Sequence, residues 1–166
     1  EIESRREQNG YLDEATCQRI LRYAADVNSS FVSGRGYRYF AEYYLHEKDY
    51  QQAMHCLTES AKYFLGGDYF EELAWTYYMM GVVSGQMGSG LFALNYYFTG
   101  LGYVEQEEAF SLKAKMHSGI GYTLLCMNRY EEAAKHYSLA RTYHKQEQDY
   151  PDRIADIILC LVYDGL

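Results

Sequence analysis

The residues best suited to nucleophilic or metal chemistry are scattered along the chain rather than grouped. The 166 residues include five histidines and four cysteines, Cys17, Cys56, Cys126 and Cys160. No two cysteines form a CxxC motif, and none stands at metal-ligand spacing from a histidine. His55 and Cys56 are adjacent, but neighbouring side chains on a helix point about 100° apart, so they do not face one another as a base and its nucleophile. We therefore predict no catalytic residue, no metal and no cofactor, and we interpret the cysteines as small reduced core residues of a cytoplasmic protein.

Other features of the composition exclude further classes of function. The Gly-Gly-Asp sequence at 66–68 lacks the Lys-Ser/Thr that completes a phosphate-binding loop. The formal net charge of −8 disfavours nucleic acid as a partner, because that role needs a basic surface. No apolar stretch reaches the roughly 18 to 20 residues of a membrane span, so we predict no membrane insertion.

Small residues recur every forty positions, and this period predicts the architecture. Two sets are spaced in this way: Ala41, Gly81 and Gly121, and then Ala53, Ala93 and Ala133. After the second set, each copy has a large residue followed by a small one three positions later: Leu57 and Ser60, Tyr97 and Gly100, Tyr137 and Ala140. A helical hairpin cannot bury its apolar face alone, so such a period indicates stacked hairpins with an extended binding surface rather than a catalytic pocket.

The apolar spacing predicts one unpaired helix, three hairpins and a closing helix. We expect helices at residues 12–27, 34–46, 50–65, 68–87, 91–104, 109–127, 130–146 and 153–163. Asp49 and Asp68 are predicted to cap the helices that follow them. We divide the chain into an N-terminal helix at 1–33, repeats at 34–73, 74–113 and 114–149, and a C-terminal helix at 150–166.

These copies resemble tetratricopeptide repeats. The third copy matches best, with Ile120-Gly121, Leu124, Tyr130, Ala133, Tyr137 and Ala140 at the family's spacing. The second departs from the pattern at Ser84 and Gly90, where larger residues are usual. The resemblance implies an all-α fold, a right-handed superhelix of antiparallel helix hairpins. Since the ordinary repeat has 34 residues, longer helices or longer turns must hold about six more in each copy. The longer spacing is similar to that of bacterial signalling proteins, in which such arrays adjoin a GGDEF diguanylate cyclase domain or the helix-turn-helix domain of a peptide-sensing regulator.

In this family a concave groove is lined by the first helix of each hairpin, and the resemblance carries that role to twelve positions. They are Arg35, Arg38, Glu42 and His46, then Trp75, Tyr78, Val82 and Gln86, then Lys115, Ser118, Tyr122 and Cys126. A basic end and an aromatic middle suit an extended peptide with an acidic group and an apolar side chain.

Three of these positions have a structural alternative. Arg35 and Arg38 could be solvated or could pair with Glu42, since Arg38 and Glu42 are four apart on one helix, and Trp75 could pack against the turn at Gly66 and Gly67. The carboxylate clamp of the family's chaperone-tail binders is not expected, because Glu42, Val82 and Tyr122 replace its asparagines.

The sequence therefore predicts a protein- or peptide-binding module, the sensory or scaffold part of a larger bacterial signalling protein. The alternative is an oligomerisation or structural module with no peptide ligand; an enzyme is not expected. The closing helix is apolar on nearly all sides, with Ile154, Ile157, Ile158, Leu161 and Val162. We expect it to meet a following helix, a neighbouring domain or a second chain, most simply as a homodimer.

Overall fold

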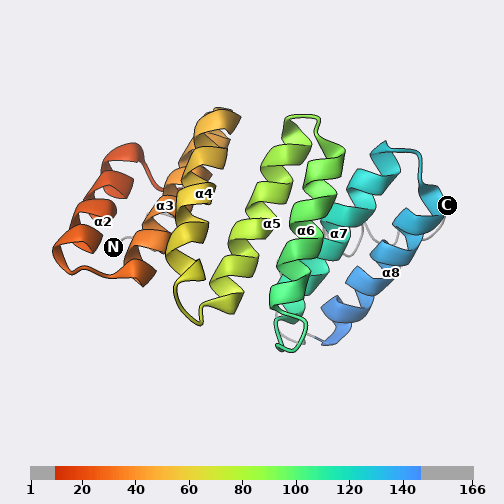
Figure 1. The fold of residues 1–166 in the computed structure, drawn as a ribbon. Helices are drawn as coiled ribbons and strands as arrows, with labels where there is room; N and C mark the ends of the chain where they lie inside the picture. Colours follow the sequence, from red (N-terminus) through yellow and green to blue (C-terminus); the bar gives the residue numbers. More distant parts are fainter. Residues whose placement is uncertain (1–9, 147–166) are drawn as a thin grey trace.

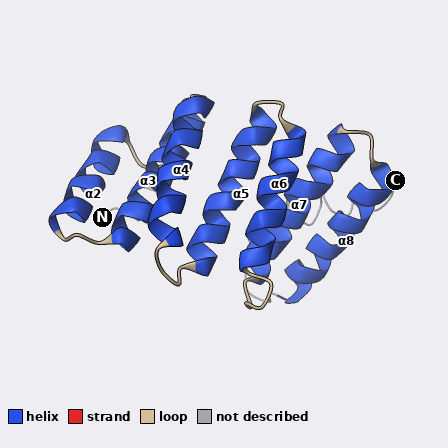
Figure 2. Cartoon of the chain, in the orientation of Figure 1, coloured by secondary structure: helices blue, strands red, loops and turns tan. Residues whose placement is uncertain are grey.

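The computed structural model describes residues 10–146, and these residues form seven helices and no strand (Figures 1 and 2). The helices are α2 (Glu14–Asp26), α3 (Ser30–His46), α4 (Tyr50–Leu65), α5 (Phe70–Gln86), α6 (Gly90–Tyr103), α7 (Phe110–Cys126) and α8 (Tyr130–Gln146). The predicted all-α fold of paired helices is confirmed. The closing helix expected at 153–163 lies outside the described residues.

The forty-residue period reappears in the helix boundaries. The first helices of the three hairpins begin at residues 30, 70 and 110, and the second helices begin at 50, 90 and 130. Each first helix is 17 residues long and is joined to its partner only by residues 47–49, 87–89 or 127–129. The additional residues of each copy therefore mainly lengthen the helices.

The α2 helix has the register of the second helix of a hairpin. Its buried Cys17 and Ala24 stand forty residues before the buried Leu57 and Phe64 of α4. Each helix packs on the next one along the chain, and α3, α5 and α7 also contact one another in succession. The result is a row of helices from α2 to α8, in which one set of helices stacks along the array (Figure 1).

Three helix starts show where local capping decides the boundary. Asp49 caps α4 as predicted, with a carboxylate oxygen that accepts from the Gln52 amide at 3.1 Å. The α3 helix begins at Ser30 instead of Gly34, because the Ser29 hydroxyl caps it through the Val32 amide. The prediction for Asp68 is wrong, since the helix begins two residues later and Tyr69 occupies the cap position without a side-chain hydrogen bond.

The three hairpin turns share one backbone conformation. The second residue of each turn has a left-handed φ: 61° at Lys48, 76° at Gly88 and 60° at Asn128. The next amide then bonds to a carbonyl five residues back, which ends the first helix in the same way each time (Asp49 to Tyr44, Ser89 to Ser84, Arg129 to Leu124). The turn thus depends on backbone geometry that glycine and asparagine adopt readily and lysine does not.

Small and large residues match in volume where the helices of a hairpin cross. A Cβ atom on Gly121 would lie 3.1 Å from the Tyr137 ring, and one on Gly81 would lie closer still to the Tyr97 ring. In the first hairpin the small residue is Ala41, and the large one is Leu57 rather than an aromatic ring. Each copy therefore keeps the same total volume at the crossing.

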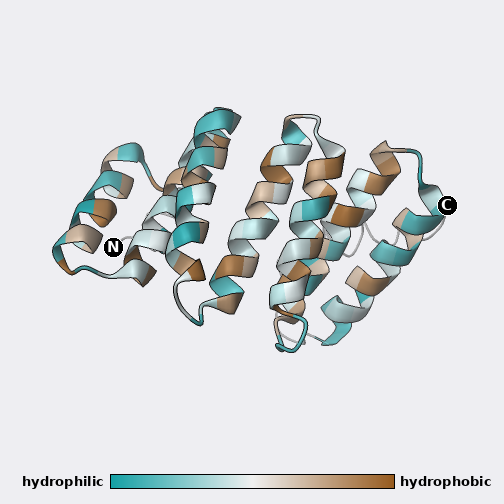
Figure 3. Ribbon diagram, in the orientation of Figure 1, coloured by the Kyte–Doolittle hydropathy of each residue, from teal (hydrophilic) through white to brown (hydrophobic). Residues whose placement is uncertain are grey.

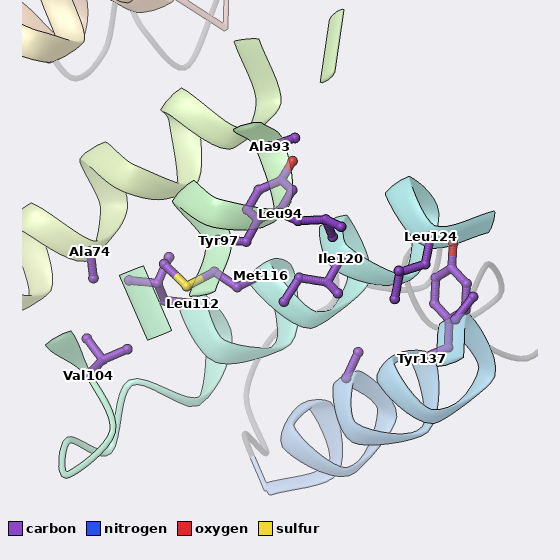
Figure 4. Packing of buried hydrophobic residues seen from close by; sticks show 12 residues of the cluster. Ala74, Ala93, Leu94, Tyr97, Val104, Leu112, Met116, Ile120, Leu124 and Tyr137 are labelled. Carbon is purple, nitrogen blue, oxygen red and sulfur yellow. The ribbon is translucent and has the colours of Figure 1, made fainter. Parts of the chain in front are cut away.

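The core forms two clusters along the row. One joins α3, α4 and α5, and the other joins α5, α6, α7 and α8. In the second cluster Tyr97, Met116, Ile120 and Tyr137 are buried between successive helices (Figure 4). Because α5 contributes to both clusters, the hairpins share their apolar cores and the array is continuous.

Candidate binding surface

The twelve predicted groove residues lie on the three first helices, four each on α3, α5 and α7. Their exposure differs along the row. Arg38 is buried at 8% exposure, while His46, Gln86, Tyr122 and Cys126 are exposed and the other seven are partly buried. Since α3 contacts α5 and α5 contacts α7, these residues form a surface that extends over three hairpins.

The two arginines at the basic end of this surface share one carboxylate of the next hairpin. The Arg38 guanidinium lies 2.5 Å from the Glu72 carboxylate and also donates to the Glu72 carbonyl oxygen at 3.4 Å. Arg35 lies 3.8 Å from the same carboxylate and donates to the Tyr39 hydroxyl at 2.8 Å. The closest partner of Arg38 is therefore Glu72 on the next hairpin, not Glu42 on its own helix. Arg38 joins α3 to α5 and has little surface left for a ligand.

A hollow opens at the Glu42 and His46 end of the surface. It has a volume of about 320 Å³ and is lined by Glu42, Leu45 and His46 of α3 together with Gly10 and Tyr11. The Tyr11 ring stacks on the His46 ring with centroids 3.9 Å apart. The segment before α2 thus forms one wall of the hollow, a feature that the repeat pattern did not predict because Tyr11 lies outside the repeats.

Aromatic residues dominate the middle of the surface. Trp75 and Tyr78 meet edge to face at 5.5 Å, and both pack with Val82 against the second core cluster. At the turn suggested as an alternative site for Trp75, the Tyr69 ring lies against Gly67 instead. Trp75 is therefore partly exposed beside the core of α5 to α8.

One position on α5 is glycine where the equivalent positions of α3 and α7 are leucine. Gly85 is exposed, and an added Cβ atom would meet nothing within 4 Å. Leu45 and Leu125 stand forty residues before and after it. A glycine inside a helix costs about 0.5–1 kcal/mol relative to alanine, and no packing contact of Gly85 explains it.

The α7 end combines Lys115, Ser118, Tyr122 and Cys126. Tyr122 is 56% exposed and is the most accessible aromatic residue among the twelve. Cys17, Cys56 and Cys126 are all free thiols, but Cys126 is exposed whereas Cys17 and Cys56 are buried. Burial raises the pKa of Cys17 to about 12 and that of Cys56 to about 11, which keeps both as inert thiols at neutral pH.

The structure also contains a pair of histidines, one buried and one partly exposed, that the sequence did not suggest. His117 of α7 and His136 of α8 are joined through their Nδ1 atoms at 2.9 Å. Burial, with smaller effects of His136 and Lys113, lowers the pKa of His117 to about 4, so it is neutral at physiological pH. Lys113 donates to the carbonyl oxygens of residues 105 and 107. The turn at residues 127–129 folds α8 back along α7 and so brings the two histidines together. The predicted pairing of these two helices was the sequence signal that could have suggested this contact.

Neither histidine forms part of a larger reactive group. Over residues 10–146 there is no cluster of three or more His, Cys, Asp or Glu side chains able to hold a metal ion. In the same residues, no helix has both the length and the apolar character needed to cross a bilayer.

No protein-family model matches the chain, and no similar sequence is found among curated proteins.

Proposed function

We propose that this protein is a peptide- or protein-binding module of the tetratricopeptide type, and that α3, α5 and α7 carry its binding surface. The observation that supports this most directly is the exposure pattern of α5 and α7. At the predicted positions Trp75, Tyr78, Val82 and Tyr122 retain contact with solvent, as do Phe70, Tyr77, Phe110 and Leu125 of the same two helices. Leu73, Val83, Leu112 and Ile120, by contrast, are buried in the core. Aromatic and aliphatic groups in such a row can bind the side chains of an extended segment.

The chemistry of the surface narrows the type of ligand. Arg35 and Arg38 share the single carboxylate of Glu72, Arg38 is buried, and an apolar hollow lies beside Glu42 at the same end. We therefore place the acidic group of the ligand away from the α3 end. Lys115 on α7 is partly exposed and is the cation that an acidic group would meet. We expect a peptide whose apolar side chains contact α5 and α7, with its acidic group toward Lys115.

Gly85 suits such a ligand. Its missing side chain exposes the α5 backbone at a position where the first helices of the neighbouring hairpins carry leucine. A ligand can approach the helix closely at that point, which gives a reason for a residue that lowers helix stability.

The wider setting follows from the resemblance to bacterial signalling arrays. We propose that the module is the sensory or scaffold part of a larger cytoplasmic signalling protein and senses a peptide or a partner segment. Catalysis is not part of the proposal, because Cys17 and Cys56 are inert thiols and His117 is buried.

The experiment is a peptide array on the full chain, followed by calorimetry with the selected peptide. Gly85→Leu restores the leucine found at residues 45 and 125, so it should fold at least as well as the wild type while filling the proposed contact. We expect it to weaken binding at least tenfold, and Tyr122→Ala to weaken it similarly. Thr58→Leu is the control, because it adds a leucine at an exposed helical position on α4, outside both α5 and α7. Equal binding by Gly85→Leu and the wild type would refute the proposed surface.

A further inference from the structure

A second surface lies on α6, the second helix of the middle hairpin, and its residues do not follow the pattern of the other hairpins. Leu91 is 71% exposed, Phe92 63% and Phe98 50%. The residues forty positions earlier are Gln51, Gln52 and Thr58, and those forty positions later are Glu131, Glu132 and Ser138. At these three positions the second helix is polar in the first and third hairpins and apolar in the middle one.

These side chains form one continuous stripe. Leu91, Asn95, Phe98 and Gly102 are spaced by four, three and four residues, which places them on one side of the helix. All four are exposed, while Ala93, Leu94, Tyr97 and Gly100 of the same helix are buried in the core. Brown segments accordingly recur along the visible side of α6, whereas hydrophilic colour covers much of α4 (Figure 3). The stripe thus remains exposed beside the core, although the Phe98 ring also meets the His136 ring of α8 edge to face at 5.8 Å.

Charge indicates what covers the stripe. The α6 helix contains no Asp, Glu, Lys or Arg from Gly90 to Tyr103, in a chain with a formal net charge of −8. In a two-fold dimer the residues near the axis meet their own copies, so any charge there would face a like charge. The uncharged stretch runs from Leu73 to Val104 and includes the whole of α6, so two copies of α6 can meet at an axis without facing like charges of their own.

The polar residue within the stripe is also self-complementary. The Asn95 side chain carries both hydrogen-bond donors and an acceptor, so two copies can bond to each other across an axis. Gly102 leaves open space beside it, where a neighbouring helix can approach closely. We propose that the α6 stripe, Leu91, Phe92, Asn95, Phe98 and Gly102, is a homodimer interface in which α6 packs against α6 of a second copy.

The size of the stripe sets the expected affinity. A helix of 14 residues is about 21 Å long, so the stripe covers less than the roughly 800 Å² per partner of a standard interface. The dimer is therefore weak, with dissociation in the micromolar range or above. A two-fold axis at α6 involves different residues from the proposed ligand surface on α5 and α7. The sedimentation result for the dimer and the peptide-binding result can therefore differ, and each tests its own proposal.

Sedimentation of the full chain over a range of concentrations tests the interface. We expect a monomer–dimer equilibrium, and we expect Leu91→Glu with Phe98→Glu to raise its dissociation constant at least tenfold. The matched control is Gln51→Glu with Thr58→Glu, the same changes forty residues earlier on α4, which should leave it unchanged. Circular dichroism checks that both variants stay helical. A monomeric wild type, or a dimer lost only in Ile158→Glu with Val162→Glu, would overturn the proposal.

Cross-linking provides a second readout that does not depend on weakening the fold. In a Cys126→Ser, Cys160→Ser background, Asn95→Cys should form a covalent dimer on mild oxidation, because the two copies of residue 95 meet near the axis. His55→Cys, its equivalent on α4, should not. Equal cross-linking of the two variants would contradict the α6 interface.

Discussion

The fit between Gly81 and Tyr97 gives the most quantitative prediction for stability. A Cβ atom at residue 81 would meet three carbons of the Tyr97 ring closer than real Cβ atoms approach. The ring cannot move away freely, because a Cβ on Gly119 of α7 would lie only 2.7 Å from its Cζ, so the ring is held between two glycines. We expect Gly81→Ala to lower the free energy of unfolding by about 1–3 kcal/mol through overpacking, after a gain of up to about 1 kcal/mol in helix propensity.

The first hairpin supplies the compensating change. There the same crossing is filled by Ala41 and Leu57, so adding Tyr97→Leu to Gly81→Ala recreates a combination that the protein already uses. Tyr97→Leu alone leaves a cavity and should destabilise. The double variant should therefore be more stable than the sum of the two single effects predicts, by about 1–2 kcal/mol.

Urea denaturation followed by far-ultraviolet circular dichroism measures the four free energies of this cycle. Gly121→Ala is an internal comparison and should cost less than Gly81→Ala, because its Cβ would lie 3.1 Å from the Tyr137 ring. Gly121→Leu, which extends further into that ring, should cost about 1–3 kcal/mol. Strict additivity in the Gly81 and Tyr97 cycle would refute the argument that their volumes are matched.

Three further predictions concern the buried ion pair, the histidine pair and the turns. Arg38→Ala should destabilise the folded chain by about 2 kcal/mol in thermal unfolding. This is less than a fully buried pair would lose, because Glu72 is partly exposed. Glu72→Gln should act in the same direction, and an unchanged Tm in both variants would refute the structural role of the pair. The folded pKa of His117, about 4, lies below its ordinary value of 6.5. Its contribution to the free energy of unfolding is therefore fully present above pH 6.5 and is lost as the pH falls toward 4, by about 3 kcal/mol at most. His117→Gln should flatten that part of the curve of stability against pH, and an unaltered slope would show that other groups cause it. Lys48→Gly should stabilise the chain by up to about 1 kcal/mol and Gly88→Ala should destabilise it by a similar amount, because both residues have left-handed φ; denaturation midpoints that shift in the same direction would contradict this.

Sequence periodicity predicted the features that repeat. The bounds of α4 and α8 agree with the expected ranges 50–65 and 130–146, and the small residues lie at the crossings where they were expected. Such features are predictable because each copy must bury the same face with the same spacing. The start of α3 was missed by four residues, because the cap at Ser29 belongs to the connection before the first copy and not to the repeated pattern.

Contacts between hairpins were not predictable in the same way. Spacing within one helix suggested Glu42 as the partner of Arg38, but Glu72 lies 34 residues away on the neighbouring hairpin and approaches more closely. The stacking of Tyr11 on His46 likewise joins a segment outside the repeats to the end of α3. Only the stacking geometry of successive helices brings such residues together, and a single sequence carries no direct signal of it.

The central claim is that the exposed residues of α5 and α7 form a ligand-binding surface, and Trp75 tests it most directly. It is the single tryptophan of the chain and lies partly exposed in that surface. Titration of the full chain with a peptide selected on the array should shift its emission with a saturable dependence on concentration, and Gly85→Leu should abolish that shift at the same peptide concentrations. A confirmed peptide that binds by calorimetry but leaves the Trp75 emission unchanged, with equal affinity for Gly85→Leu, would contradict the account.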